Sequence, residues 1–352
     1  LIYVPLPTKA LAMPGRLPPE AAELGYDPEV AASVYDGLLA QLRGAGIETL
    51  DARQALRRVD TAGTVPVYRT DPRLAPGGVE ALSLALADLL GGGSGEARAV
   101  AVRADRAADG ERPLASPMRT KLQTHCLSQV PMPLLGQGDQ PVSRSLHAAR
   151  SDAQPAPQVA LVGSEIAVDP ALGLADRLAA RSGLSVAASM VAGEDRRADA
   201  FGAISSYLSS PDFENARPEV LIWVNPVWLN LSRYGSRPLR ELIALAGPHC
   251  TRPIALSETA NGVRGVLGGD VGAQAALRLD SGGTALRRVE FHFTAADGEI
   301  RRRIVDRHPE QHPTSRMVLP LAGLWPEGAT SVEILADTPW GARPSLTLCE
   351  EI

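Results

Sequence analysis

Hydrophobic positions in the first 90 residues alternate between strand-like runs and helical spacing. Strands are predicted at 1–7 (LIYVPLP) and 46–52 (GIETLDA), and helices at 28–46 and 76–93. The apolar positions that define the first of these helices are Val30, Val34, Leu38, Leu39 and Leu42. A strand, a helix and a second strand in this order form a βαβ unit, so we expect a parallel sheet.

This alternation is interrupted over residues 91–157 and then returns. The interrupted stretch is rich in Gly, Pro, Ser and Arg, and we expect loops there that border a functional site. After it, strands and helices are again predicted in turn, with strands at 158–164, 184–193 and 218–226 and helices at 170–183 and 199–213. The residues up to 250 are therefore expected to form one α/β domain.

Beyond Pro253 the periodicity becomes the two-residue alternation of half-buried strands. In the clearest case polar residues alternate with apolar ones: Arg288, Glu290 and His292 with Val289, Phe291 and Phe293. Similar short runs, separated by Asp-Gly, Pro and Gly turns, occur at 299–306, 315–323 and 331–339. A β-sandwich of about 100 residues is therefore expected over 254–352.

Composition supports two domains and narrows the choice of partner. A chain of 352 residues that is 45% hydrophobic and 21% charged can bury two ordinary cores. Its net charge of -5 gives no electrostatic reason to expect nucleic acid or an anionic membrane as the main partner. No uninterrupted run of 18 apolar residues occurs. Because the chain starts within an apolar run, without methionine or signal sequence, we expect a further segment before Leu1.

The cysteines and histidines of the chain provide few combinations that could bind a metal ion. Three cysteines, Cys126, Cys250 and Cys349, are too widely spaced for a CxxC redox motif or a zinc ribbon. Cys250 and Cys349 either form a disulfide that closes a loop of about 100 residues or are two unrelated buried thiols. Of six histidines, only His308 and His312 have ligand-like spacing, and the prolines around them disfavour a helix. We therefore expect no metal site and no cofactor.

Two short segments carry candidate chemistry. The first, VYRTDPRLAPGG, contains Tyr68, Asp71 and Arg73. The second, LVGSE, places Ser164 and Glu165 directly after a predicted strand, at a loop-to-helix turn whose N–H groups can stabilise an oxyanion. A guanidinium, whose pKa exceeds about 12, is not a general base at neutral pH. A glutamate cannot be deprotonated and acylated as a serine is.

These segments resemble the alginate O-acetylation proteins of the SGNH-hydrolase-like type. The first segment is similar to the one that carries the Asp and His of that family's Ser-His-Asp triad, matching it at Tyr68, Thr70, Asp71 and Gly78. In this resemblance Arg73 stands at the histidine position and Leu74 at a tryptophan position. Aligned on Leu161-Val162-Gly163, the second segment places Glu165 at the nucleophile position and Ser164 one residue before it.

The resemblance extends through most of the chain, in order and spacing more than in identity. The opening segment agrees with the family at Pro5, Pro7, Thr8, Lys9, Pro14, Leu17 and Pro18. The resemblance implies a flavodoxin-like SGNH-hydrolase-type parallel sheet over 1–250, with a loop-rich insertion, and a carbohydrate-binding β-sandwich over 254–352. It also implies a disulfide between Cys250 and Cys349, and a partner for Cys126 upstream of residue 1.

For function, the resemblance implies a periplasmic protein of exopolysaccharide O-acetylation. Its partners would be an acidic or neutral exopolysaccharide and a membrane O-acyltransferase or other polysaccharide-secretion proteins, and no nucleic acid. Our first hypothesis is that Asp71, Arg73 and Glu165 form an ion-pair cluster at a degenerate triad, in a protein that binds polysaccharide or a partner. The alternative is an active O-acetyltransferase with Ser164 as nucleophile and His125 as base. A third is a purely structural scaffold in a secretion complex.

Candidate binding residues lie in both expected domains. Lys9 and Tyr68 belong to the family-like segments of the first domain. Trp325 and Trp340 lie in predicted loops of the β-rich part, beside Pro and Gly, where flat aromatic rings could stack on sugars. The alternative for both tryptophans is that they anchor loops onto the sandwich.

Overall fold

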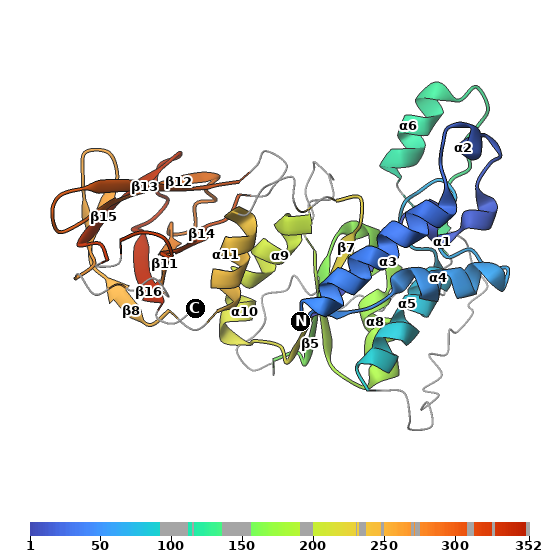
Figure 1. Cartoon of the computed structure of the whole chain (residues 1–352), viewed down its shortest axis with the longest axis horizontal. Helices are drawn as coiled ribbons and strands as arrows, with labels where there is room; N and C mark the ends of the chain where they lie inside the picture. Colours follow the sequence, from blue (N-terminus) through green and yellow to red (C-terminus); the bar gives the residue numbers. More distant parts are fainter. Residues whose placement is uncertain are drawn as a thin grey trace. The chain divides into compact units, whose positions relative to one another are not determined.

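The computed structural model describes most of the chain and divides it into two compact units (Figure 1). The first unit comprises Leu1–Ala203 and Ala216–Leu229, and the second comprises Ile204–Asn215 and Asn230–Ile352. The described residues are 1–91, 112–114, 116–135, 156–190, 200–229, 231, 237–247, 250–268, 271, 275–307, 313–325 and 328–349.

A five-stranded parallel sheet forms the centre of the first unit, as the βαβ pattern predicted. Its strands are β1 (Ile2–Leu6), β2 (Glu48–Thr49), β5 (Val159–Gly163), β6 (Val186–Ser189) and β7 (Val220–Pro226), in the order β2-β1-β7-β5-β6. Every residue of β1 and β5 is buried, which is typical of a parallel sheet covered on both faces.

The last strand of the sheet, β7, lies between β1 and β5. Pro5 pairs with Asn225 in the register of β1 and β7, and Gly163 pairs with Val224 in the register of β5 and β7. The chain leaves β1 toward β2 on one side of β7 and leaves β5 toward β6 on the other side. In open α/β sheets ligands bind at the carboxyl ends of strands where the connections diverge in this way. The turns after β1 and β5 are therefore the natural place for a site.

The four predicted helices are present as α3, α5, α8 and α9, and the structure adds others. The helices are α1 (Lys9–Ala12), α2 (Glu20–Glu23), α3 (Pro28–Gly44), α4 (Ala52–Thr61), α5 (Pro76–Leu89), α6 (Pro117–His125), α7 (Glu165–Val168), α8 (Leu174–Ser182), α9 (Ala200–Leu208), α10 (Pro211–Asn215) and α11 (Arg237–Ala246), with 3-10 turns at Pro14–Arg16 and Pro170–Leu172. Helix α4 was not predicted, and α6 lies where only loops were expected. A short antiparallel pair, β3 (Arg112–Pro113) and β4 (Leu134–Leu135), flanks α6.

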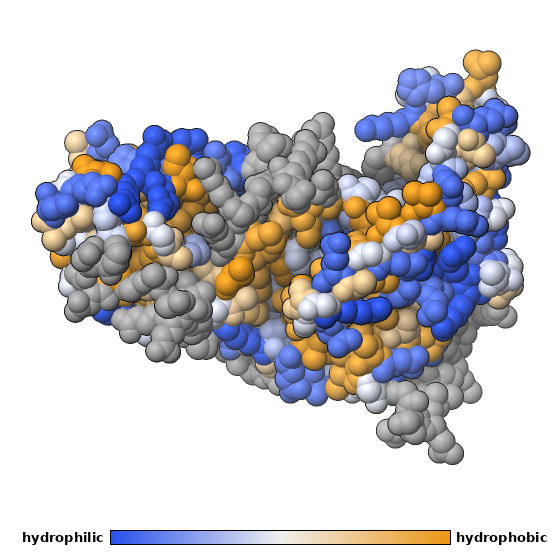
Figure 2. Space-filling view, in the orientation of Figure 1, coloured by the Kyte–Doolittle hydropathy of each residue, from blue (hydrophilic) through white to orange (hydrophobic). Residues whose placement is uncertain are grey.

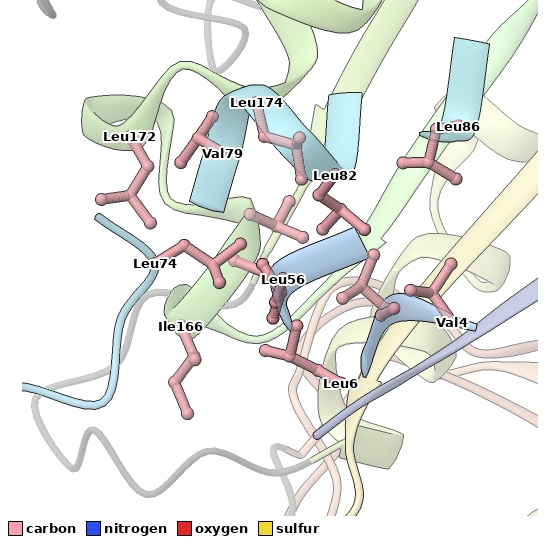
Figure 3. Close-up of a cluster of buried hydrophobic side chains, with 14 of the residues drawn as sticks. Val4, Leu6, Leu56, Leu74, Val79, Leu82, Leu86, Ile166, Leu172 and Leu174 are labelled. Atoms are coloured by element: carbon pink, nitrogen blue, oxygen red, sulfur yellow. The ribbon is translucent and has the colours of Figure 1, made fainter. Parts of the chain in front are cut away.

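One face of the parallel sheet packs against α4, α5 and α8 (Figure 3). Leu56 of α4, Leu82 of α5 and Leu174 of α8 are buried there beside Val4 of β1. Leu74, which directly follows Arg73, is also buried in this core. The loop that carries Asp71 and Arg73 is therefore anchored by an apolar side chain.

Helix α3 differs from its predicted apolar face. Asp27 caps it by accepting hydrogen bonds from the N–H groups of Glu29 and Val30, but Val30 and Val34 are 59% and 70% exposed. Of the predicted positions, Leu39 is buried and Leu38 and Leu42 are half-buried, and Tyr35, which was not among them, is buried as well. The Tyr35 hydroxyl donates to the carbonyl of Pro5 at 2.7 Å, and this bond fixes which side of the helix faces the sheet.

The second unit contains two antiparallel sheets, consistent with the expected β-sandwich. The first has the order β13-β12-β15-β10-β9 and the second β14-β11-β16-β8. Their strands are β8 (Arg252–Ile254), β9 (Leu256–Glu258), β10 (Val263–Val266), β11 (Ala276–Asp280), β12 (Arg288–Thr294), β13 (Ile300–Asp306), β14 (Arg316–Pro320), β15 (Ser331–Ala336) and β16 (Ser345–Cys349). The predicted alternation of β12 is confirmed, because its apolar residues are fully buried and its polar residues are not.

Covalent and ionic links hold the second unit together. A disulfide joins Cys250 to Cys349, so the first alternative for these cysteines is confirmed. Arg307 and Glu241 of α11 form an ion pair whose side chains are only 4% and 6% exposed. Among the helices that the structure describes, none is long and apolar enough to cross a bilayer.

Candidate functional site

The central feature of the site is a buried ion pair between Asp71 and Arg73. Arg73 Nε donates to Asp71 Oδ1 at 2.7 Å and Nη2 donates to Oδ2 at 2.8 Å. The backbone N–H of Arg73 also donates to Oδ1, at 2.9 Å. A bidentate pair of this kind is among the strongest geometries available to arginine. The Asp71 carboxylate is therefore held by a guanidinium from the same loop, two residues further along the chain.

Burial and charge oppose each other at this pair. Burial alone would raise the pKa of Asp71, but hydrogen bonds from Arg73 and Ser116, together with the charge of Arg73, lower it overall. Burial alone would lower the pKa of Arg73, but Asp71 and the charges of Asp169 and Glu165 raise it. Both side chains are thus held in their charged forms, and neither has the pKa of a general base at neutral pH.

Two further carboxylates lie on the segment that follows β5. Asp169 Oδ2 is 3.6 Å from Arg73 Nη1. Glu165 is the first residue of α7 and is half-buried, and its charge contributes to the raised pKa of Arg73. The N–H of Leu74 donates to the carbonyl of Ile166 at 3.1 Å, which joins the two loops through their backbones. The structure therefore brings the two sequence segments together.

Lys9 and Tyr68 support the loop that carries the ion pair. Lys9 begins α1, directly beyond the end of β1, and its Nζ donates to the carbonyls of Tyr68 at 2.6 Å and Arg69 at 3.2 Å. Burial lowers the pKa of Lys9, and the nearby charge of Asp71 partly offsets this. The Tyr68 ring is part of the first core. Both residues hold the loop against the end of β1.

Ser116 and Thr70 connect the same loop to the segment that contains α6. Ser116 Oγ donates to the carbonyl of Thr70 at 3.0 Å, and Thr70 Oγ1 donates to the carbonyl of Pro131 at 2.8 Å. Ser116 also caps α6 by accepting from the N–H of Arg119. Part of the stretch that was expected to border the site does so through these bonds.

The turn after β5 requires a glycine. A Cβ at Gly163 would lie 2.4 Å from the carbonyl oxygen of Val224, a backbone atom of the neighbouring strand. Ser164 follows and is 6% exposed, and its Oγ has no hydrogen-bond partner in the part of the chain that the structure describes. A serine needs an adjacent base to become a nucleophile. The hydroxyl is present at the turn, but no described group activates it.

Other polar atoms without partners are buried at the end of β7, the strand next to Ser164. Asn225 comes directly after Val224, which pairs with Gly163 of β5. The Nδ2 atom of Asn225 donates to the hydroxyl of Tyr3 at 2.7 Å. Asn225 Oδ1 and Trp223 Nε1 have no partner among the described residues. Burial raises the pKa of Tyr3, and the bond from Asn225 partly opposes this. Buried polar groups are rarely left unpaired, so these two atoms are unusual for the interior of a sheet.

The alternative base, His125, is the last residue of α6 and is exposed. Within the described part of the chain, no hydrogen bond joins it to Ser164. His308 and His312, the pair with ligand-like spacing, lie outside the described residues. The described residues contain no group of three or more metal-ligating side chains.

The two candidate tryptophans of the second unit pack against its core. Trp325 Nε1 donates to Glu299 at 2.8 Å, and the Arg301 guanidinium lies 4.6 Å from its ring centroid. Trp325 precedes β15 and Trp340 follows it, so the two lie at opposite ends of a six-residue strand. Such a strand spans roughly 20 Å. The two rings do not form one continuous sugar-stacking face.

Sequence reasoning found Asp71, Arg73, Ser164 and Glu165 but missed Asp169. The only local signal for Asp169 is that it precedes Pro170, and there it caps the 3-10 turn by accepting from the N–H of Ala171. Its approach to Arg73 depends on two loops that are almost 100 residues apart in sequence, and periodicity does not report such contacts.

A family model and several solved structures match this chain. The model of the SGNH hydrolase-like domain of the acetyltransferase AlgX matches residues 1–227. The structure of Pseudomonas aeruginosa AlgX superposes with a TM-score of 0.70 at 17% identity, covering 100% of this chain and 84% of that one. The O-acetyltransferase domain of Pseudomonas putida AlgJ gives a TM-score of 0.47 at 20% identity, covering 70% of this chain and 81% of that domain. No curated protein sequence matches.

Proposed function

Because the chain belongs to the family of AlgX-type SGNH hydrolase-like acetyltransferase domains, whose members are linked to alginate acetylation, we propose that it serves exopolysaccharide O-acetylation without transferring acyl groups itself. In this proposal it is a degenerate member that binds the polysaccharide or a protein of the acetylation machinery. Residues 1–250 carry the degenerate site, and 254–352 act as a carbohydrate-binding module.

The observation that carries this proposal is the bidentate contact of Arg73 with Asp71. In the triad that the family uses, an aspartate orients a histidine, which removes the proton from the serine. Here the aspartate is fully engaged by a guanidinium that cannot accept a proton at neutral pH. Glu165 stands where the resemblance places the nucleophile. The pair therefore supports a site that keeps its architecture and has lost proton transfer.

Membership of the family supports a proposal for where the protein acts and what it binds. We propose that it acts in the periplasm, next to a membrane O-acyltransferase or other polysaccharide-secretion proteins. Its ligand in this proposal is an acidic or neutral exopolysaccharide. Arginine is the predominant cation of the chain, with only two lysines among 35 basic residues, and its planar fork recognises carboxylates such as those of uronic acids.

Hydrolysis of a chromogenic acetyl ester tests the loss of acyl transfer. We expect the protein to release the chromophore no faster than buffer, and Ser164→Ala to behave identically. Turnover by the unaltered protein that Ser164→Ala abolishes would refute the degenerate site and establish the O-acetyltransferase alternative. In that event His125→Ala identifies or excludes the alternative base, because its exposed position makes the substitution harmless to folding.

Binding of uronic-acid and neutral glucan oligomers tests whether the protein binds polysaccharide. We expect calorimetric binding that weakens on Trp325→Ala or Trp340→Ala. Since the two rings lie at opposite ends of β15, each single substitution should leave the sugar contact of the other tryptophan intact. The double variant should therefore lose more binding affinity than either single variant. Absence of binding to every oligomer would favour the scaffold hypothesis.

A further inference from the structure

The segment around α6 projects apolar side chains into solvent. We call residues 116–134 the α6 projection. Met118 and Leu122 are each 37% exposed, Met132 is 45% exposed and Leu134 is 38% exposed. Leu127, just after the helix, is fully exposed. Figure 1 draws α6 at the outer limit of the first unit, away from the parallel strands. Exposed apolar side chains gathered in one short segment of the chain can form an interaction surface.

The base of the projection is fixed at the candidate site. Leu114, just before it, is buried in the first core, and its N–H donates to the carbonyl of Pro133 at 2.9 Å. Ser116 binds the carbonyl of Thr70, and Thr70 binds the carbonyl of Pro131. Both ends of the projection are therefore tied to the domain.

The projection also satisfies its own polar groups. Gln123 Nε2 donates to the carbonyls of Cys126 and Ser128, each at 3.2 Å, and Gln123 Oε1 accepts from the N–H of Val130 at 2.8 Å. Arg119 Nε donates to the carbonyl of Val130 at 2.9 Å. Polar backbone that is already paired can enter an apolar environment without a large desolvation cost. The exposed side chains are thus presented by a preformed element.

The charge of this segment is opposite to that of the chain. The chain carries a net charge of -5, yet no Asp or Glu occurs from Arg112 to Gly138. This stretch holds Arg119, Lys121 and His125 on α6. Lys121 is next to Leu122 in sequence and three residues from Met118, so on a helix it borders the apolar pair. In the orientation of Figure 1, Figure 2 shows hydrophobic and hydrophilic surface side by side in this region.

We propose that the α6 projection docks on an anionic lipid surface. Leu127 and the exposed side chains of α6 would enter the interface, with Lys121 and its basic neighbours among the headgroup phosphates. Elements that lie in membrane interfaces combine exposed apolar residues with Lys and Arg in this manner. The apolar side chains are spread over a helix, a turn and the strand that follows. That spread suits a flat, deformable interface better than a protein groove, which receives one face of one helix.

Electrostatics makes this docking orientation-specific. The negative net charge of the whole chain gave no reason to expect binding to an anionic membrane, and such a membrane would repel most of the protein's surface. Attraction of a basic segment to an anionic leaflet falls off within a Debye length, about 8 Å at physiological salt. Only charges close to the membrane therefore affect binding. The α6 projection would approach the membrane while the rest of the molecule faces away from it.

Co-sedimentation of the full chain with vesicles tests the proposal. We expect binding to phosphatidylcholine vesicles that contain phosphatidylglycerol, little binding to phosphatidylcholine alone, and release by high salt. Lys121→Glu should lower the partition coefficient by roughly tenfold or more, since each basic residue near an anionic surface contributes to attraction. Leu127→Ser should lower it by roughly tenfold, through loss of an inserted side chain. Leu127 is fully exposed, so this change does not threaten the fold.

Matched controls come from the same unit. Leu24→Ser changes an 88% exposed leucine outside the projection, and Arg57→Glu reverses an exposed charge on α4. Both should bind vesicles as the unaltered protein does. Equal binding to neutral and anionic vesicles, or anionic binding that survives Leu127→Ser, would overturn the proposal. Docking of the projection on another protein would give no vesicle binding, which also overturns it. These outcomes are independent of ester turnover.

Discussion

Arg73 donates hydrogen bonds to both carboxylate oxygens of Asp71 from its guanidinium, and a third from its own backbone N–H. The two residues are only two positions apart in the sequence. The side chains of the pair are only 6% and 2% exposed. The contact is thus local in sequence and deeply buried, and Ser116 and Asp169 add further interactions to it. The carboxylate of Asp71 is thus committed to neutralising a buried cation.

Removing the cation should destabilise the first unit. Arg73→Met leaves the Asp71 carboxylate buried without its main partner, and breaking a buried pair in this way costs on the order of 3 kcal/mol. Urea unfolding at neutral pH measures the change. Arg69→Met is the control, because Arg69 is exposed and such substitutions usually change stability by less than about 0.5 kcal/mol. Equal effects of the two substitutions would show that the pair does not stabilise the fold.

Acid should weaken the protein through the same aspartate. The pKa of Asp71 is lowered in the folded state, so its stabilising contribution is present above the ordinary carboxyl pKa near 4. That contribution is lost as pH falls through the lower folded value. Asp71→Asn should flatten the decline in stability below about pH 4. In Arg73→Met, burial raises the pKa of Asp71, so the sign of its contribution reverses and acid partly restores stability. An unchanged acid profile in both variants would contradict this assignment.

The turn after β5 should not tolerate a side chain. A Cβ at Gly163 would lie 2.4 Å from the Val224 carbonyl oxygen, and a backbone atom in a central strand cannot move aside. Gly163→Ala should therefore cost about 2 kcal/mol or more, measured by thermal unfolding. Gly37→Ala in α3 is the matched control, because an added Cβ there would meet nothing within 4 Å, and it should stabilise by about 0.5 to 1 kcal/mol. A neutral Gly163→Ala would show that the two strands can separate here.

The hydroxyl of Ser164 should be dispensable for stability. It is buried without a partner among the described residues, so Ser164→Ala should leave the free energy of unfolding unchanged or raise it by about 1 kcal/mol. Ser83→Ala is the comparison, since Ser83 is fully buried and its Oγ donates to the carbonyl of Glu80 at 2.8 Å. That variant should lose about 1 kcal/mol. If Ser164→Ala were the more damaging change, the hydroxyl would have a partner in solution.

Reduction should act on the second unit alone. The disulfide between Cys250 and Cys349 spans 99 residues, and closing a loop of that length contributes on the order of 4 kcal/mol in the chain-entropy model. The double variant Cys250→Ala/Cys349→Ala should show a lower melting transition for the sandwich, followed by Trp325 and Trp340. The transition of the first unit, followed by Trp223, should not move. A shift of both transitions would mean that the units unfold together.

The parallel sheet could be predicted because three of its strands, β1, β5 and β7, are short and almost wholly apolar, and the sandwich because β12 alternates at every position. Helix α3 could be placed but not oriented. Its valines and leucines share helical spacing, yet the bond from Tyr35 to Pro5 selects a different buried side. Helix α4 was missed because its buried residues are mainly alanines and Leu56. Helix α6 was missed because most of its residues are exposed, so it has no apolar periodicity to detect.

Residue identity is enough to establish the chemical character of the candidate positions, since arginine is no base at neutral pH and glutamate cannot be acylated as a serine is. How those residues are used depends on the fold. In the folded chain Arg73 pairs with Asp71, Asp169 approaches the same guanidinium, and the Ser164 hydroxyl is buried beside β7. Side-chain type is local information, whereas burial and ion pairing depend on loops that are joined across a sheet whose strands are distant in sequence.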